Sequence, residues 1–310
     1  MKKILAAALT LLALAGCSAL DRMMPAMVAS DYYQKTQTGM PLERKYTAPG
    51  TFHTASQTFA GGRQRFKTYK VWYPADLPHS KQTYPVVVFA NGSGVAYYKY
   101  EAIFNHLASW GFVVIGNDDS SSWDGSSTSQ SLAFLQQQNQ HPDSLFYRKL
   151  DINRAGVSGH SQGGVGAINA VGNFANSHQF KALYTASTPK HALALALKWP
   201  YNVGKINVPY FMNAGTGPFD GGDGKDPDSG IAPLTSLRDN YARISGNGLT
   251  VMARRSHADH GELLYLPDGY MTAWFRYTLM NDSEAAQVFA GAAPEIRRNT
   301  QNWQDVQIKR

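Results

Sequence analysis

Residues 155–163 read Ala-Gly-Val-Ser-Gly-His-Ser-Gln-Gly, and this stretch decides the fold. Its first half is typical of a buried strand, and the segment 163–173 that follows is typical of a helix. Gly159, Ser161 and Gly163 form a G-x-S-x-G motif, which places a serine on a sharp turn from strand to helix. Because such a turn strains the backbone and leaves no room for neighbouring side chains, glycine is needed on both sides. The motif predicts Ser161 as a nucleophile.

Strands and helices alternate on both sides of this turn. Two runs rich in β-forming residues, 51–59 and 66–73, indicate an antiparallel hairpin. Buried strands are expected at 85–90, 112–116, 154–158, 182–187, 208–214 and 249–253. Helical patterns lie at 103–111, around 132–135, and at 163–173, 191–199 and 271–279, whereas 117–129 is rich in Ser, Asp and Gly and is expected to be a loop. This order predicts a mostly parallel, twisted sheet with helices on both faces.

A family resemblance rests on the motif and on the residues ahead of it. Residues 150–164, which begin Leu-Asp-Ile-Asn-Arg, resemble the α/β-hydrolases of the dienelactone-hydrolase and cutinase-like polyesterase group. The likeness extends from about Tyr84 to Asp282 and includes Trp-Gly-Phe-Val-Val-Ile at 110–115. It implies the α/β-hydrolase fold and a triad in the chain order Ser, Asp, His, acting through an acyl-enzyme intermediate. The motif is highly specific for the fold and poorly specific for the substrate.

Two backbone N–H groups are expected to bind the negative oxygen that develops during acyl transfer. In this fold one donor is the residue after the nucleophile, here Gln162, and the other comes from the loop after an early strand. Asn91-Gly92-Ser93-Gly94 forms such a loop, which favours the Ser93 N–H, although an ordinary glycine turn is the alternative. Three tyrosines beyond it either wall an acyl pocket or pack in the core: Tyr97, Tyr98 and Tyr100.

Two histidines after the last expected strand compete for the role of general base. A catalytic imidazole accepts the serine proton on one nitrogen while the other nitrogen donates to a carboxylate. Asp-His-Gly at 259–261 resembles the catalytic loop of bacterial esterases in this group, which favours His260. The segment 256–274, which begins Ser-His and is ungapped to Ala-Trp, resembles the polyesterase pattern and favours His257. We predict His260 as the base and His257 as a supporting or surface residue.

The acid should follow the strand at 208–214, where four aspartates compete: Asp220, Asp223, Asp226 and Asp228. In related hydrolases an aspartate lies just before an Ile-Ala-Pro-like turn, and here Asp228 precedes the Ile-Ala-Pro of 231–233. We therefore predict Asp228, with Asp220 second, although an insertion at 217–226 departs from the family pattern. A Ca²⁺-binding loop is the alternative interpretation of these aspartates, but their spacing does not fit an EF-hand. We expect no metal and no cofactor.

The N-terminal residues predict a secreted lipoprotein. Two lysines precede an uncharged run at 4–14, which is too short for a bilayer, because spanning takes about 20 residues. Leu14-Ala15-Gly16-Cys17 resembles the lipobox of bacterial lipoproteins, in which the cysteine is acylated, and Ser18 resembles the outer-membrane sorting rule. Cys17 is the only cysteine, so the mature chain forms no internal disulfide. An ordinary signal peptide with an incidental cysteine is the alternative.

These features predict a signal peptide at 1–16, a tether and N-terminal extension at 17–48 and one hydrolase domain at 49–310. We expect a monomer held by a palmitate-type anchor in the bacterial cell envelope, at the outer membrane. The net charge of +7 comes from scattered basic residues, which indicate no nucleic-acid-binding module.

The substrate is expected to be a carboxylic ester. Only 188–207 lies where many lipases insert a helical lid, so an open cleft is expected, suited to bulky or polymeric esters. Polyesterases carry a C-terminal disulfide and a cleft tryptophan, whereas 186–189 here reads Ala-Ser-Thr-Pro, so polyester activity is an analogy at the level of the fold. The alternatives are a serine peptidase or transacylase with the same triad, and a non-catalytic surface lipoprotein.

Overall fold

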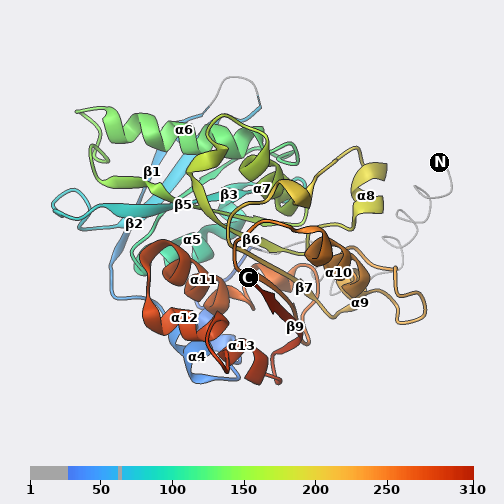
Figure 1. Cartoon of the computed structure of the whole chain (residues 1–310). Helices are drawn as coiled ribbons and strands as arrows, with labels where there is room; N and C mark the ends of the chain where they lie inside the picture. The colour runs from blue at the N-terminus through green and yellow to red at the C-terminus, as the bar shows by residue number, and fades with distance from the viewer. Residues whose placement is uncertain (1–26, 62–64) are drawn as a thin grey trace.

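The computed structural model describes residues 27–61 and 65–310, which form one nine-stranded sheet (Figure 1). In the order in which they lie side by side, the strands are β1 (Thr54–Ala60), β2 (Thr68–Pro74), β4 (Val113–Asn117), β3 (Tyr84–Ala90), β5 (Leu150–His160), β6 (Phe180–Ala186), β7 (Tyr210–Gly215), β8 (Thr250–Arg255) and β9 (Trp303–Lys309). The six central strands pair in parallel, whereas β1, β2 and β9 pair antiparallel at the two edges. The predicted hairpin and the mostly parallel sheet are confirmed.

Helices cover both faces of this sheet (Figure 1). One face carries α6 (Ser126–Gln140), α7 (Gln162–Gly172) and α10 (Leu234–Arg243), and the other carries α5 (Glu101–Ser109), α11 (Asp268–Met280) and α12 (Ser283–Phe289). Strand β3 shows why: Val86 and Val88 pack in one core, and Val87 and Phe89 in the other. Because side chains of a strand alternate between faces, a strand buried on both sides must be apolar throughout. The α/β-hydrolase fold is confirmed.

The remaining elements are short. They are α3 (Tyr32–Lys35), α4 (Pro41–Thr47), α8 (His191–Ala196), α9 (Pro218–Gly221), α13 (Glu295–Arg298) and the 3₁₀ turns η1 (Tyr97–Tyr100), η2 (Ser177–Gln179), η3 (Val203–Lys205) and η4 (Glu262–Leu264). Within the described ranges, no helix is both long and apolar enough to span a membrane.

The N-terminal segment packs against the domain. Tyr32 and Tyr46 are buried in the same core as α11 and α12. The carboxylate of Glu43 accepts hydrogen bonds from the Trp303 indole (3.0 Å) and from the Asn302 amide (2.7 Å), which joins this segment to the C-terminal strand. Residues 28–48 therefore form a part of the N-terminal extension that packs on the folded body. The rest of the expected tether, including Cys17, lies outside the described residues.

Helices α10 and α12 were not expected from the sequence, and two further differences have a local cause. Strand β9 was not expected, and the reason is a bulge: Asp305 has a φ of 56°, and the pairing of β8 with β9 shifts register there. A bulge interrupts the alternation of apolar residues by which a strand is recognised in sequence. Helix α6 begins at Ser126, inside the expected loop, because Gly125 before it has a φ of 81° and packs against α7, where a Cβ would lie 2.8 Å from the Gly166 carbonyl oxygen.

Candidate active site

The G-x-S-x-G motif forms the turn between β5 and α7. Ser161 has a φ of 57° and a ψ of −124°, a strained conformation for a residue with a side chain. A Cβ at Gly159 would lie 2.1 Å from the Gly163 carbonyl oxygen, and a Cβ at Gly163 would lie 2.0 Å from that of Ala90. Both positions therefore require glycine, and the expected strained turn is confirmed.

The backbone of Ser161 is fixed while its hydroxyl is free. Its N–H donates to the Ala186 carbonyl oxygen (3.0 Å), and its own carbonyl accepts from the Gly164 N–H (2.9 Å). In the part of the chain that the structure describes, the half-buried Ser161 hydroxyl has no hydrogen-bond partner. The N-terminus of α7 starts at the next residue, and its dipole favours negative charge at this point. The turn therefore presents an unengaged hydroxyl where an anion is stabilised.

A buried histidine–aspartate pair lies at the same end of the sheet. His260 is on the loop after β8, and its Nδ1 is 2.7 Å from Oδ1 of Asp220, on α9 after β7. The other oxygen of Asp220 accepts hydrogen bonds from the Ser187 hydroxyl (2.5 Å) and the Gly215 N–H (2.8 Å). With its carboxylate so occupied, Asp220 fixes the imidazole orientation and leaves Nε2 of His260 without a partner among the described residues.

The charge state of Asp220 follows from these contacts. Burial by itself raises the pKa of this fully buried carboxyl. The charge and hydrogen bond of His260, together with the bonds from Ser187 and Gly215, outweigh burial and hold the pKa below its ordinary value. Asp220 is therefore an anion at neutral pH, as the acid of a triad must be.

His160, the residue before the nucleophile, joins the histidine to the serine turn. Its ring lies 4.7 Å from the His260 ring, centroid to centroid, and its Nε2 is 2.7 Å from the His260 carbonyl oxygen. Burial, followed by the charge of His260, lowers the pKa of His160 to about 3. The neutral ring therefore donates its Nε2 proton to that carbonyl. Sequence reasoning missed this role, and the only signal was the place of His160 inside the motif.

The loop after β3 supplies a free backbone donor. The Gly92 N–H donates to the Tyr100 hydroxyl (2.9 Å), and the Gly94 N–H donates to the Ser120 carbonyl oxygen (3.0 Å). Between them the N–H of the exposed Ser93 has no acceptor in the described part of the chain. Gln162 is the first residue of α7, where an N–H has no acceptor within the helix. The two expected oxyanion donors are thus both unoccupied.

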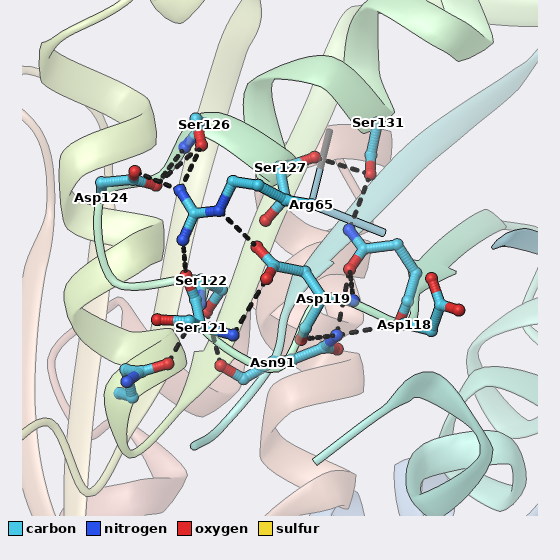
Figure 2. Close-up of polar contacts among 12 residues, drawn as sticks. Arg65, Asn91, Asp118, Asp119, Ser121, Ser122, Asp124, Ser126, Ser127 and Ser131 are labelled. Atoms are coloured by element: carbon cyan, nitrogen blue, oxygen red, sulfur yellow. Dashed lines mark hydrogen bonds and ion pairs between the residues drawn. The ribbon is translucent and has the colours of Figure 1, made fainter. Parts of the chain in front are cut away.

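A polar network holds these two donor segments together (Figure 2). The Ser122 N–H donates to Oε1 of Gln162 (3.0 Å), and the Ser122 hydroxyl donates to the Asn91 carbonyl oxygen (2.5 Å). Asn91 in turn donates its amide to the carbonyl oxygens of Asn117 (2.8 Å) and Asp119 (2.9 Å). The guanidinium of Arg65 reaches across this loop to Asp119 and Asp124 and to the Ser121 carbonyl (Figure 2). The loop expected at 117–129 therefore braces the oxyanion side of the site.

The predicted acid, Asp228, is not beside His260, and this is a correction to the sequence interpretation. Asp228 is exposed, and its carbonyl oxygen accepts from the Lys190 ammonium group. After Asp220 the chain leads away from the site. It comes back at Ala232, whose N–H donates to the Asp220 carbonyl oxygen (3.1 Å). Residues 222–230 thus form an excursion, and the Ile-Ala-Pro turn that favoured Asp228 follows its far end.

The other open alternatives are also located by the structure. His257 is exposed, has a φ of 58°, and donates its backbone N–H to the Thr216 hydroxyl (3.1 Å).

In the acidic segment 222–230, the Asp223 carboxylate accepts the Lys225 N–H (2.9 Å). The described residues contain no group of three or more His, Cys, Asp or Glu that could hold a metal. Tyr100 is buried against Phe89, so it packs in the core, whereas Tyr98 is 48% exposed.

Comparison with known proteins gives one family. The model of the family described as PET hydrolase-like matches residues 31–193, slightly more than half of the chain. The matched range contains the Ser161 turn, the Ser93 loop and the Ser122 segment that binds Asn91 and Gln162. It ends before Asp220 and His260. No curated protein matches the chain.

Proposed function

Because the chain belongs to the PET hydrolase-like family of α/β-hydrolases, we propose that it is a serine ester hydrolase with the triad Ser161, His260 and Asp220. The family supports a hydrolase, while the acid and base rest on geometry beyond the matched range. The observation that carries the proposal is the 2.7 Å His260–Asp220 pair, held by His160 against the strained turn of Ser161.

The contacts support the following acylation step. Nε2 of His260 takes the Ser161 proton as the serine oxygen attacks the ester carbonyl, while Asp220 keeps the Nδ1 proton directed toward itself and stabilises the imidazolium. The carbonyl oxygen becomes negative beside the N–H groups of Ser93 and Gln162, and losing one such donor costs roughly 3–4 kcal/mol. The bond to the alcohol then breaks, and His260 returns the proton to the leaving oxygen.

Deacylation repeats the sequence with water. His260 removes a proton from water as the water oxygen attacks the Ser161 ester, and the oxyanion forms at the same donors. The acid product leaves when the bond to the serine oxygen breaks and His260 reprotonates Ser161. Each residue ends in the state in which it began, so no external proton donor, metal or cofactor is required.

Bulky or polymeric esters are the substrates that the surroundings favour. Between β6 and β7 the chain forms only the six-residue α8 and the turn η3, a connection much shorter than a helical lid. The exposed Tyr98 lies in the chain shortly after the Ser93 loop. An ester group on a large molecule approaches such a site more easily than one beneath a lid, and the family description points to the same class.

A fluorophosphonate probe combined with a substrate panel tests this function. Wild-type protein should be labelled at Ser161 and should hydrolyse p-nitrophenyl esters faster than matched amides, and Ser161→Ala should abolish both activities with little change in Tm. Faster turnover of amides or acyl transfer to an added alcohol would instead support a peptidase or transacylase. Absence of labelling would support a non-catalytic lipoprotein.

The lipid anchor is a separate proposal that rests on sequence alone. Acylation of Cys17 would hold the monomeric enzyme at the bacterial outer membrane, near esters outside the cell. Cys17→Ser should end palmitate incorporation and either release the protein from the membrane fraction or leave an uncleaved precursor there. Unchanged labelling would contradict the proposal.

A further inference from the structure

Asp259, the residue before the base, lies between the two catalytic loops. It is 3% exposed, and its Oδ1 accepts three backbone N–H groups: those of Phe219 (3.0 Å), Asp220 (3.1 Å) and His260 (2.9 Å). Within residues 27–61 and 65–310, its Oδ2 accepts only the Phe219 N–H, at 3.2 Å. One carboxylate oxygen therefore receives the backbone N–H of both the acid and the base.

The surroundings are shaped around this carboxylate. The N–H groups of Phe219 and Asp220 open the short helix α9, where backbone donors have no partner within the helix. Gly217 precedes α9, and a Cβ there would lie 2.4 Å from Cγ of Asp259, so any other residue would displace the carboxylate. The site for Asp259 is thus built by the same turn that carries the acid.

The catalytic steps make no use of the Asp259 carboxylate as a proton donor or acceptor. The 2.7 Å contact between His260 and Asp220 nevertheless depends on two loops that follow different strands. A carboxylate that binds the backbone on both sides of that contact fixes their separation. Misplacement of a catalytic group by about 1 Å costs roughly 100-fold in rate.

We propose that Asp259 is a positioning residue that sets the His260–Asp220 contact by holding the backbone of both residues on one carboxylate oxygen. This inference rests on the proposed Ser161–His260–Asp220 mechanism. The loops also meet where the Thr216 and Gly217 N–H groups donate to the Ala258 carbonyl oxygen, at 2.9 and 2.8 Å. Loss of Asp259 therefore shifts the acid relative to the base without separating the loops.

Three variants test the role. Asp259→Ala should lower kcat for a p-nitrophenyl ester about 100-fold with KM changed less than about threefold, because the substrate does not touch this carboxylate. Asp259→Asn keeps an oxygen at the Oδ1 position and should restore kcat to within about tenfold of wild type. Glu262→Ala is the matched control, since its carboxylate accepts the Asp259 N–H (2.9 Å) on the same loop but binds neither Asp220 nor His260.

A double-mutant cycle separates positioning from folding. In an Asp220→Ala background there is no acid to position, so Asp259→Ala should cost less than about threefold. If Asp259→Ala does not fold, the same cycle with Asp259→Asn decides, because its smaller loss must also disappear without Asp220. Equal losses in both backgrounds, or an equal loss in Glu262→Ala, would overturn the inference. Failure of wild-type protein to label with fluorophosphonate would instead overturn the proposed function.

Discussion

The described part of the chain contains two buried histidine–aspartate pairs, and they differ in the contacts of the second ring nitrogen. In both, Nδ1 is 2.7 Å from a carboxylate oxygen of an aspartate without exposed surface. His260 pairs with Asp220 at the site, whereas His106 of α5 pairs with Asp268 at the start of α11. Nε2 of His106 is 2.9 Å from the Ala48 carbonyl oxygen, but Nε2 of His260 has no partner among the described residues.

The second nitrogen distinguishes a structural pair from a catalytic one. Both nitrogens of His106 face oxygen acceptors, an arrangement that favours the doubly protonated ring. Burial works against the charge, but Asp268 and the backbone carbonyls outweigh it and raise the pKa of His106. Asp268 also accepts from the Tyr32 hydroxyl, so this pair fastens the N-terminal segment to the domain. A buried histidine–aspartate contact therefore indicates catalysis only when the second nitrogen is free to exchange a proton.

The largest effect is expected when each histidine–aspartate pair is disrupted separately. His260→Ala should lower kcat by roughly 10⁴-fold with little change in Tm, because it removes the base. His106→Ala should leave kcat nearly unchanged but destabilise the fold by roughly 3–5 kcal/mol, since it leaves Asp268 buried without its partner. Steady-state kinetics and denaturant unfolding on both variants measure this. An exchange of the two outcomes would show that the free nitrogen does not identify the base.

The next test compares two aspartates on the segment that joins β7 to α10. Asp220→Asn should lower kcat by roughly 10³- to 10⁴-fold, because an amide in place of the carboxylate favours the wrong tautomer of His260. Asp228→Asn should match wild type, since its exposed carboxylate lies on the 222–230 excursion. Kinetics on one ester decide between them, and an inactive Asp228→Asn enzyme would restore the assignment made from sequence.

Sequence reasoning predicted the geometry of the site where nearby atoms fix it. It failed where the geometry depends on a segment that leaves the site and folds back to it. The Ser161 turn was predictable because Gly159 and Gly163 are required by atoms within a few residues or on the adjacent strand. Asp220 was ranked second because nothing in the sequence shows that 222–230 leaves the site and comes back. The packing of residues 28–48 was missed for a similar reason, since Glu43 finds its partners some 260 positions later in the chain.

Two buried serines extend the comparison to the oxyanion side. The Ser122 hydroxyl binds the Asn91 carbonyl, whereas the equally buried hydroxyl of Ser127 has no hydrogen-bond partner among the residues that the structure describes. Ser122→Ala should lower kcat about tenfold at nearly constant KM, because it loosens the loop that carries the Ser93 N–H. The loss is smaller than that expected for removal of an oxyanion donor, since the N–H group itself is still present. Ser127→Ala, with the same change in volume, should leave kcat unchanged. Equal kcat values for the two variants would remove Ser122 from the oxyanion brace.

The smallest effect is the part of the pH dependence of stability that comes from His106. Its pKa in the folded protein lies above the unfolded value of about 6.5, so the pair contributes its full stability below that pH. The contribution is lost as the pH rises through the folded pKa, because the ring then loses one of the two protons by which it binds Asp268 and the Ala48 carbonyl. The Tm advantage of wild type over His106→Gln should therefore shrink above pH 6.5, by roughly 2–4 °C for each kcal/mol lost. His257→Gln is the matched control, because this exposed histidine has no ionic partner in the described part of the chain. A His106→Gln difference that grew with pH would instead mean that the buried His106 ring is neutral in the folded protein.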